Sequence, residues 1–408
     1  MKSNYKRLGD YISPVNIRNT QQKVERLLGI NIDKFFMPSV ANVVGTDLSN
    51  YKLVRKNQFA CNRMHVGRDY RLPVALSRTD EEFMVSPAYD VFEVKDTNRL
   101  NPEYLMMWFS RKEFDRNAWF YTDGDVRGGL PWKSFEEMIL PIPTIAKQKE
   151  IVKEYNVIKD RIALNQQLIK KLEETAQAIY KQWFVDFEFP DENGKPYKSN
   201  SGEMVDSELG EIPKGWEYTK LSKIINIKDG THDSPNPVDK GYPLVTSKHL
   251  NPYDIALNET YNISEDDYYQ INKRSKVDKF DILFSMIGTI GLVNYVLYDK
   301  IEFAIKNVAL FKTSERKEIA EYILFYLKSD YMKLYLASNP NGSTQNYVTL
   351  GFLREMPILL PAKSVLLIFE DTSKKIIESI QLKVNENNIL SKLKELLLSK
   401  LATVEVTV

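Results

Sequence analysis

The sequence contains two similar halves, and this internal duplication constrains the fold more strongly than any other feature. Three pairs of segments match in the same order along the chain. The first pair is separated by 221 residues (59 to 280) and the other two by 218 (103 to 321, 138 to 356). Matches in one order at nearly one spacing predict a chain built from two copies of one unit. The matching pairs are 59–67 with 280–288, 103–109 with 321–327, and 138–143 with 356–361.

A long helical pattern ends each copy. In the first copy, apolar residues between 151 and 183 alternate steps of four and three, with Asn165 filling the one gap, which is the heptad pattern of a coiled coil. Neither Gly nor Pro occurs in residues 147–189, and the second pattern runs over about 363–401. Because one helix of this length cannot bury its apolar seam alone, we predict that the two helices pair with each other.

Asparagines lie near the middle of both helical patterns. A buried Asn in a coiled coil fixes the register of the helices at some loss of stability. A solvent-facing Asn has no such role, and the sequence leaves both interpretations open. The residues concerned are Asn165, Asn385, Asn387 and Asn388.

Between the first helix and the second copy lies a segment rich in Asp, Glu, Asn, Ser, Gly and Pro, which is typical of a linker. In the two remaining regions, short strand-like runs alternate with helical ones, which favours an α+β fold. The predicted layout is a globular domain at 1–145, a long helix at 146–189, a linker at 190–215, a second globular domain at 216–362 and a final helix at 363–408.

The composition excludes several classes of protein. The net charge is only +1, which neither requires nor excludes a nucleic-acid partner, because basic residues can gather on one face. The single cysteine, Cys61, excludes an intrachain disulfide and a cysteine-rich metal site, and we interpret it as a core residue. With three scattered histidines, we predict no metal site. The sequence also shows neither a signal peptide nor an apolar run of membrane-spanning length, so we expect a cytoplasmic location.

Familiar catalytic motifs are absent from the sequence. It contains no P-loop, no dinucleotide-binding glycine pattern and no Gly-x-Ser-x-Gly elbow. The Asn-Pro-Pro-aromatic loop of adenine methyltransferases is also missing. The sequence therefore predicts a chain that is not itself an enzyme.

Two segments are specific enough to carry a resemblance. Residues 177–187 (QAIYKQWFVDF) close the first helical pattern, and residues 207–216 (SELGEIPKGW) open the second copy. Together with the run from 140 to 151, they resemble the conserved central region of the specificity subunit of type I restriction–modification systems. The resemblance spans the whole chain, because that family is a duplicated target-recognition domain plus a long helix. The second helix departs from the family, since it lacks the usual Gln-rich start.

The resemblance implies an α+β protein with two duplicated target-recognition domains, separated by two long helices that pair as an antiparallel coiled coil. It implies a non-catalytic DNA reader, in which each domain recognises one half of a bipartite target and the helices set the gap between the halves. Two modification subunits are expected to dock on the helices and to methylate adenine N6.

The resemblance also implies where the cofactors belong. None is expected in this chain, whereas S-adenosylmethionine belongs to the modification subunit, and ATP and Mg to the restriction subunit that cleaves unmodified DNA. A coiled-coil scaffold whose globular domains bind protein, without DNA readout, is the alternative function. A fused methyltransferase–nuclease is disfavoured by the missing motif.

Side-chain chemistry indicates which residues could read DNA, because phosphates need Lys or Arg and base edges need Arg, Lys, Asn, Gln, Ser or Thr. The first domain offers a basic turn after Phe59 and a Gly-rich loop at 123–129, and the second offers polar turns and the loop at 341–346. For each residue the alternative is a solvated loop position. The candidates are Arg63, His65, Arg68, Arg71, Arg127, Thr231, His232, Lys248, Ser343, Thr344, Gln345 and Asn346.

Residues that could bind a partner lie on the long helices. Their charged faces fit either solvated flanks of the coiled coil or a docking surface for the modification subunits, and the sequence does not separate these. The candidates are Lys170, Lys171, Trp183, Phe184, Lys374 and Lys375.

Overall fold

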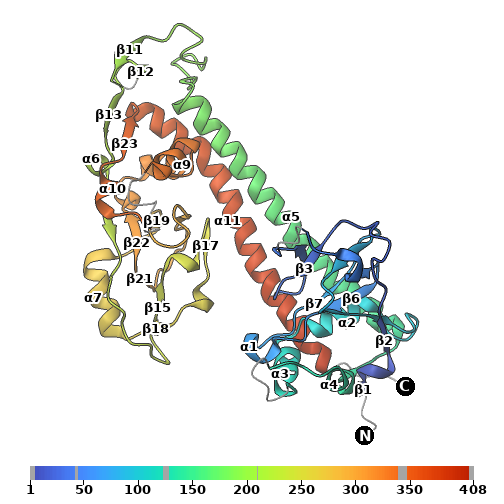
Figure 1. Ribbon diagram of the computed structural model, residues 1–408. Helices are drawn as coiled ribbons and strands as arrows, with labels where there is room; N and C mark the ends of the chain where they lie inside the picture. Colours follow the sequence, from blue (N-terminus) through green and yellow to red (C-terminus); the bar gives the residue numbers. More distant parts are fainter. Residues whose placement is uncertain (1–4, 42–44, 123–127, 209, 339–346, 404–408) are drawn as a thin grey trace. The chain divides into compact units, whose positions relative to one another are not determined.

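A computed structural model describes residues 5–41, 45–122, 128–208, 210–338 and 347–403 (Figure 1). The chain divides into two compact units. Unit 1 comprises Met1–Ala163 and Ile389–Val408, and unit 2 comprises Leu164–Asn388. Each unit holds one β-rich domain and parts of both long helices. The domain boundaries expected from the sequence remain predictions.

Unit 1 is built on a four-stranded antiparallel sheet. Its strand order is β2-β9-β6-β7, with β2 at Ile12–Val15, β9 at Asp90–Val94, β6 at Gln58–Cys61 and β7 at Val74–Leu76. One face packs on three helices, α2 (Pro102–Phe109), α3 (Lys112–Phe120) and α4 (Trp132–Glu137). The remaining elements are β1 (Tyr5–Arg7), β3 (Leu28–Ile30), β4 (Phe36–Pro38), β5 (Lys52–Val54), α1 (Val66–Asp69), β8 (Phe83–Val85) and β10 (Ile139–Pro141).

Unit 2 repeats this plan. Its sheet has the order β14-β22-β19-β20, with β14 at Ile227–Asp229, β22 at Val308–Phe311, β19 at Ile282–Ser285 and β20 at Val293–Tyr295. The corresponding helices are α8 (Ala320–Leu327), α9 (Asp330–Ala337) and α10 (Leu350–Arg354). The remaining elements are β11 (Met204–Ser207), β12 (Gly210–Pro213), β13 (Glu217–Lys220), α6 (Leu221–Ile224), β15 (Tyr242–Val245), β16 (Leu250–Asn251), β17 (Asp254–Ile255), β18 (Asn262–Ile263), α7 (Glu265–Ser275), β21 (Ala304–Ile305) and β23 (Pro357–Leu360).

The predicted duplication is confirmed by identical contacts in the two units. The Tyr104 hydroxyl donates to the Pro141 carbonyl at 3.0 Å, and the Tyr322 hydroxyl donates to the Leu359 carbonyl. Both residues of the second pair lie 218 positions after those of the first (104 to 322, 141 to 359). Helices α2, α3 and α4 likewise begin 218 residues before α8, α9 and α10 (102 to 320, 112 to 330, 132 to 350).

One of the three segment matches is shifted by two residues. Phe59 pairs with Leu76 and Phe92, whereas the residue that makes the corresponding pairs in unit 2 is Ile282, which faces Tyr295 and Phe311. The sequence had placed Phe280 opposite Phe59. Phe280 instead precedes β19, with φ 73° in the left-handed region. Because side chains alternate between the faces of a strand, a shift of two residues keeps the same face inward, and the mismatch leaves the apolar pattern unchanged.

The two long helices are α5 (Ile145–Phe184) and α11 (Lys363–Lys400), shown green and red in Figure 1. In unit 2, the end of α5 meets the start of α11, where the rings of Trp183 and Phe369 lie 5.6 Å apart between centroids. In unit 1, the first turns of α5 share a core with Leu401, which directly follows α11. The predicted antiparallel pairing is therefore confirmed.

One asparagine lies inside the helix pair. The Asn165 side chain is completely buried and donates from Nδ2 to Oδ1 of Asn387 at 3.0 Å. Asn385 and Asn388 are exposed. The question left open by the sequence is thus answered for Asn165, which is positioned to fix the register of the helices.

Helix α5 ends at Phe184, five residues before the end expected from the sequence. The Lys181 carbonyl accepts hydrogen bonds from the amides of Val185 and Asp186, and Phe187 has φ 60°. A left-handed residue just after the last turn is a common helix stop. The expected linker also contains local structure, since β11 and β12 pair as an antiparallel hairpin.

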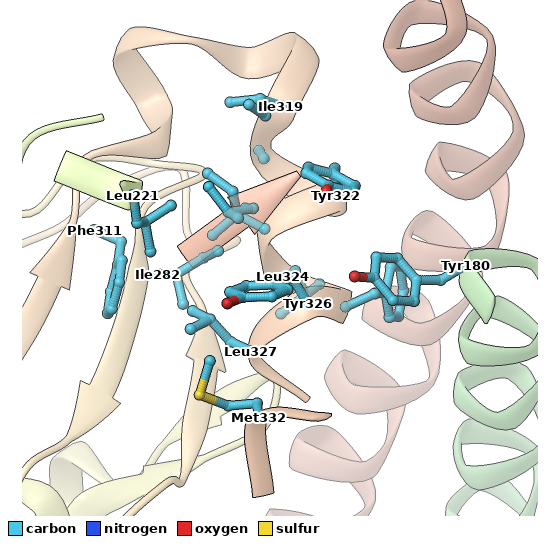
Figure 2. Packing of buried hydrophobic residues seen from close by; sticks show 14 of the residues in the cluster. Tyr180, Leu221, Ile282, Phe311, Ile319, Tyr322, Leu324, Tyr326, Leu327 and Met332 are labelled. Carbon is cyan, nitrogen blue, oxygen red and sulfur yellow. The ribbon is translucent and has the colours of Figure 1, made fainter. Parts of the chain in front are cut away.

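The core of unit 2 lies between its sheet, α8 and the end of α5 (Figure 2). Ile282 and Phe311 of the sheet and Tyr322 of α8 belong to one buried cluster with Tyr180 of α5. The rings of Tyr180 and Tyr322 are 5.8 Å apart between centroids. This packing fixes the domain on its helix. Within the described ranges, none of the helices is long and apolar enough to cross a bilayer.

Candidate nucleic-acid interface

The basic turn of unit 1 is anchored through Arg63, which follows β6. Its Nε donates to Oδ2 of Asp90 at 2.7 Å, and its Nη1 donates to the Leu130 carbonyl. The guanidinium also lies 5.5 Å from the centroid of the Trp132 ring, and only 19% of the side chain is exposed. These contacts support a role in holding the turn, and direct contact of Arg63 with DNA stays a prediction.

The other basic residues of this turn face outward. His65 is half-buried and directly precedes α1, while Arg68 and Arg71 are exposed. Arg68 pairs with Asp69 at 2.7 Å, and its hydrogen bond holds the pKa of that carboxyl below its usual value. Arg71 pairs with Asp33 at 2.9 Å. Exposed ion pairs of this kind are weak, so a phosphate can compete for either guanidinium.

Two glycines bring a second segment against this turn. The Gly67 amide donates to the Gly128 carbonyl at 2.7 Å, and a Cβ on Gly67 would lie 2.7 Å from the Gly128 Cα. Only glycine at position 67 lets the two backbone segments approach this closely. Arg127, the neighbouring candidate, lies outside the described residues.

In unit 2, a tight turn follows β14. A Cβ on Gly230 would lie 2.3 Å from the Ile305 carbonyl oxygen, so glycine is required where the turn meets β21. Thr231 then donates its amide to the Ile305 carbonyl at 3.0 Å and accepts at its own carbonyl from the Asn307 amide at 3.1 Å. The half-buried Thr231 therefore supports the turn mainly through its backbone.

A buried carboxylate holds the polar side chains at this turn together. Asp229, at the end of β14, is hydrogen-bonded to Nε2 of His232 at 2.9 Å and forms an ion pair with Arg274 of α7. The other ring nitrogen of His232, Nδ1, lies 2.8 Å from Oδ1 of Asn307. His232 and Arg274 remain 63% and 58% exposed, whereas Asp229 is buried.

The turn carrying Lys248 joins the same surface. Ser247 donates from Oγ to the Asn307 carbonyl at 3.5 Å, and Lys248 beside it is exposed. His249 is buried, and its Nδ1 accepts from the Thr246 amide at 3.0 Å. Burial lowers the pKa of His249 below its ordinary value, so it stays neutral at pH 7 and supports the turn.

The structure brings Thr231, His232 and Lys248 together around Asn307, and their contact with DNA stays a prediction. Sequence reasoning missed Arg274, Lys306 and Asn307, which complete the cluster. Nothing near them in the sequence marks them, because the contacts join residues up to 76 positions apart (231 to 307). The remaining candidates, Ser343, Thr344, Gln345 and Asn346, lie outside the described residues.

The predicted partner-binding residues divide into two groups. Lys170, Lys171, Lys374 and Lys375 are exposed, and Lys171 pairs with Glu174 at 2.7 Å. Trp183 and Phe184 are buried in the core of unit 2. Phe184 also lines a groove of about 790 Å³ with Tyr180, Tyr218, Tyr322 and Tyr326, whereas Trp183 does not. Trp183 thus supports the helix pair from inside, and partner contact by any of the six stays a prediction.

Large apolar side chains are exposed on the long helices. In unit 1 they are Val157, Ile389, Leu393 and Leu396, and in unit 2 they include Leu164, Leu168 and Leu382. Exposed apolar side chains that gather on one element are typical of a surface that binds another protein. In the part of the chain that the structure describes, no cluster of three or more His, Cys, Asp or Glu could hold a metal ion.

Comparison with known proteins adds three findings. Residues 213–397 match the family described as type I restriction modification DNA specificity domain. Over 434 aligned residues the chain is 23% identical to the HindI specificity subunit of Haemophilus influenzae, with 92% of each protein covered. It is 24% identical over 315 residues to the MjaIX specificity subunit of Methanocaldococcus jannaschii, covering 75% of this chain and 69% of that one.

Among solved structures, the S subunit of the type I restriction–modification system of M. genitalium shares the fold. The match covers 99% of this chain and 96% of that one, at 14% identity and a TM-score of 0.53. The resemblance inferred from segments 177–187 and 207–216 is confirmed by these findings together.

Proposed function

Since residues 213–397 belong to the type I restriction modification DNA specificity domain family, and the chain resembles specificity subunits along its length, we propose that it reads a bipartite DNA target. Each β-domain reads one half. The observation that carries the proposal is the duplication, because the two units hold different polar turns on the same sheet-and-helix frame. A common frame suits a common task, and different turns suit different sequences.

The DNA-facing surfaces in this proposal are the basic turn of unit 1 and the Asp229 cluster of unit 2. Arg68 and Arg71 are exposed and weakly paired, which suits contact with phosphates. His232 and Lys248 are also exposed, and they lie on turns joined through Asn307. The four loop residues at 343–346 and Arg127 are included on their chemistry alone.

The helix pair is proposed to dock two modification subunits. The exposed Lys170, Lys171, Lys374 and Lys375 and the exposed apolar side chains nearby support this role. Specificity subunits are non-catalytic, so the methyl donor S-adenosylmethionine would bind to the modification subunit. ATP and Mg would bind to a restriction subunit.

The helices are also proposed to set the gap between the half-sites. Seven residues inserted after Leu168 and seven after Glu386 preserve the heptad phase and lengthen each helix by about 10 Å. At about 3.4 Å per base pair, the gap should grow by roughly three base pairs while both half-sites stay the same. An unchanged gap in the methylated sequence would contradict the proposal.

The proposal as a whole is tested by mapping N6-methyladenine in DNA from cells that express the chain with a cognate modification subunit. We expect methylation at one bipartite sequence. Replacing residues 216–362 with the same domain of another specificity subunit should change one half and keep the other. Loss of both halves would contradict modular reading, and the purified chain alone should methylate nothing.

The alternative, a coiled-coil scaffold without DNA readout, makes an opposite prediction. Binding through phosphate contacts falls steeply with salt and, in a reader, depends on sequence. A complex that assembles fully but binds DNA independently of both sequence and salt would favour the scaffold.

A further inference from the structure

Two exposed side chains in unit 2, one imidazole and one guanidinium, share one buried carboxylate. Asp229 lies at the end of β14 and contacts His232 from the following turn and Arg274 from the last turn of α7. Helix α7 packs beside β14 and β21, and its last turn carries Arg274 to Asp229 at the end of β14. Thus a residue 45 positions further along the chain (229 to 274) is brought to the candidate interface.

This arrangement orients Arg274 on the surface. Its side chain is 58% exposed, whereas the carboxylate that holds it is buried. A guanidinium that is already held in place loses less conformational freedom when it binds a ligand. The ion pair engages one N–H of Nη2, so the second N–H of Nη2 and a neighbouring N–H of Nε or Nη1 can still form a planar fork toward a ligand.

The surroundings are suited to a polyanion. Lys306 precedes Asn307 and hydrogen-bonds the Ser234 hydroxyl, and Lys248 is exposed on the adjoining turn. Asn307 has φ 52°, in the left-handed region, and its side chain is fixed on His232. The acid at the centre, Asp229, is buried beneath these groups, whereas the nearby Asp233 is exposed.

We propose that Arg274 determines specificity in the second half of the target by contacting a base edge, with Asp229 as its positioning residue. The inference rests on the proposed function, since it assigns one base contact within that reader. The ligand is a guanine, because a fixed guanidinium matches the O6 and N7 acceptors in the major groove. Lysine keeps the charge but lacks the planar fork.

The test uses the chain assembled with its modification subunit. Arg274→Ala and Arg274→Lys are compared with wild type by methylation mapping and by affinity for the target and for duplexes changed at single positions. We expect both variants to relax the choice at one position of the second half-site. Discrimination at that position should fall roughly 5- to 150-fold, which corresponds to a single good base contact.

Lys273→Ala is the matched control, because Lys273 is the exposed neighbour of Arg274 on the same turn and hydrogen-bonds Gln270 at 2.9 Å. This variant should keep the target. Asp229→Asn keeps the size of the side chain and removes its charge, so it should relax the same position as Arg274→Ala but by a smaller factor. A target left unchanged in both Arg274 variants would overturn the inference.

A uniform loss of affinity that Arg274→Lys restores would also overturn it, because that result identifies a phosphate contact. Failure of the broader proposal looks different. In that case the wild-type complex itself would show no methylated target and no sequence preference.

Discussion

The two units join their β-domain to the long helix through opposite chemistry. In unit 1 the joint is polar: the buried Gln148 accepts from the Asn101 amide at 2.8 Å and donates to the carbonyls of Arg99 and Pro143. The corresponding positions in unit 2, 218 residues later, are Ile319 and Leu366 (101 to 319, 148 to 366). Both are buried in the unit 2 core.

The difference shows that the same arrangement of domain and helix can be stabilised either by directional hydrogen bonds or by apolar packing. A buried hydrogen-bond network requires every partner, since an unpaired group loses its full solvation. An apolar contact tolerates changes of shape more readily. The absence of a Gln-rich start in the second helix, noticed in the sequence, therefore reflects a change of joint chemistry and not a different fold.

A second pair of positions reverses this contrast between the units. Glu103 in unit 1 lies at the surface and binds Arg78 through two hydrogen bonds of 2.6 and 2.7 Å. Its counterpart Glu321 is buried in unit 2 and accepts from the Tyr295 hydroxyl at 2.8 Å. Burial raises the pKa of Glu321 to about 7. Here it is unit 2 that carries the costly polar group.

Breaking the polar joint should have the largest effect. Gln148→Leu leaves the Asn101 amide and two carbonyls without their partners, and we expect a loss of about 3–5 kcal/mol in the free energy of unfolding. Leu366→Met at the apolar joint conserves volume and should cost less than about 1.5 kcal/mol. Urea denaturation of both variants measures the difference. Equal losses would remove the contrast between the joints.

The second-largest effect should be a pH dependence of the free energy of unfolding that comes from Glu321 in unit 2. Between pH 4.5 and 7 the folded chain keeps the Glu321 proton that the unfolded chain releases. The free energy of unfolding should therefore fall as pH rises through this window, by about 3 kcal/mol in total. Glu321→Gln should abolish this component in urea titrations at pH 5 and pH 8. Glu103→Gln is the control and should leave the difference between the two pH values intact.

The Asn165–Asn387 pair between the long helices also compares hydrogen bonding with apolar packing, and the expected effect on stability is smaller. Asn387→Leu leaves the buried Asn165 amide without its partner and should reduce the unfolding free energy by about 1–3 kcal/mol. Replacing both residues by Leu should recover that loss, because no unpaired amide remains. A double variant as unstable as the single one would show that packing, and not the hydrogen bond, explains the loss.

The smallest effects on stability are expected at the basic turn. Arg68→Ala and Arg71→Ala remove exposed ion pairs and should change the unfolding free energy by less than about 0.5 kcal/mol. If they contact phosphates, each should weaken DNA binding equally for all sequences and lower the salt slope by about one. Arg55→Ala, another exposed pair in unit 1, is the control for charge. A change of target sequence would instead indicate a base contact.

The sequence predicted the parts of the fold that depend on periodicity. The heptad spacing in 151–183 and the constant offset of the later segments were enough for the helix pair and the duplication. The end of α5 was missed, since the stop comes from Phe187 in a left-handed conformation and no Gly or Pro marks it. The offset of β6 was missed because a two-residue shift preserves the apolar pattern.

Less of the candidate site than of the fold could be predicted from the sequence. Residue chemistry identified His232 and Lys248, but Arg274 lies on a helix whose nearby residues give no signal. Only tertiary packing brings it to Asp229. Trp183 and Phe184 belong to the segment at 177–187 that carries the family resemblance, and their large aromatic side chains are buried in the core of unit 2.

The constant offset of the helices α2, α3 and α4 from α8, α9 and α10 has a consequence for how such a chain can diversify. From residue 102 to the start of α5 the copies match without a single net insertion, whereas the strands before them are displaced by 219 at β7 and β20 (76 to 295) and by 223 at β6 and β19 (59 to 282). Between β6 and the start of α5, the differences in length between the copies therefore lie among the strands and their turns. Recombination between two such genes within the segment that encodes these helices would keep the reading frame. It would also join protein segments of equal length. New combinations of surface turns could then arise without rebuilding the core.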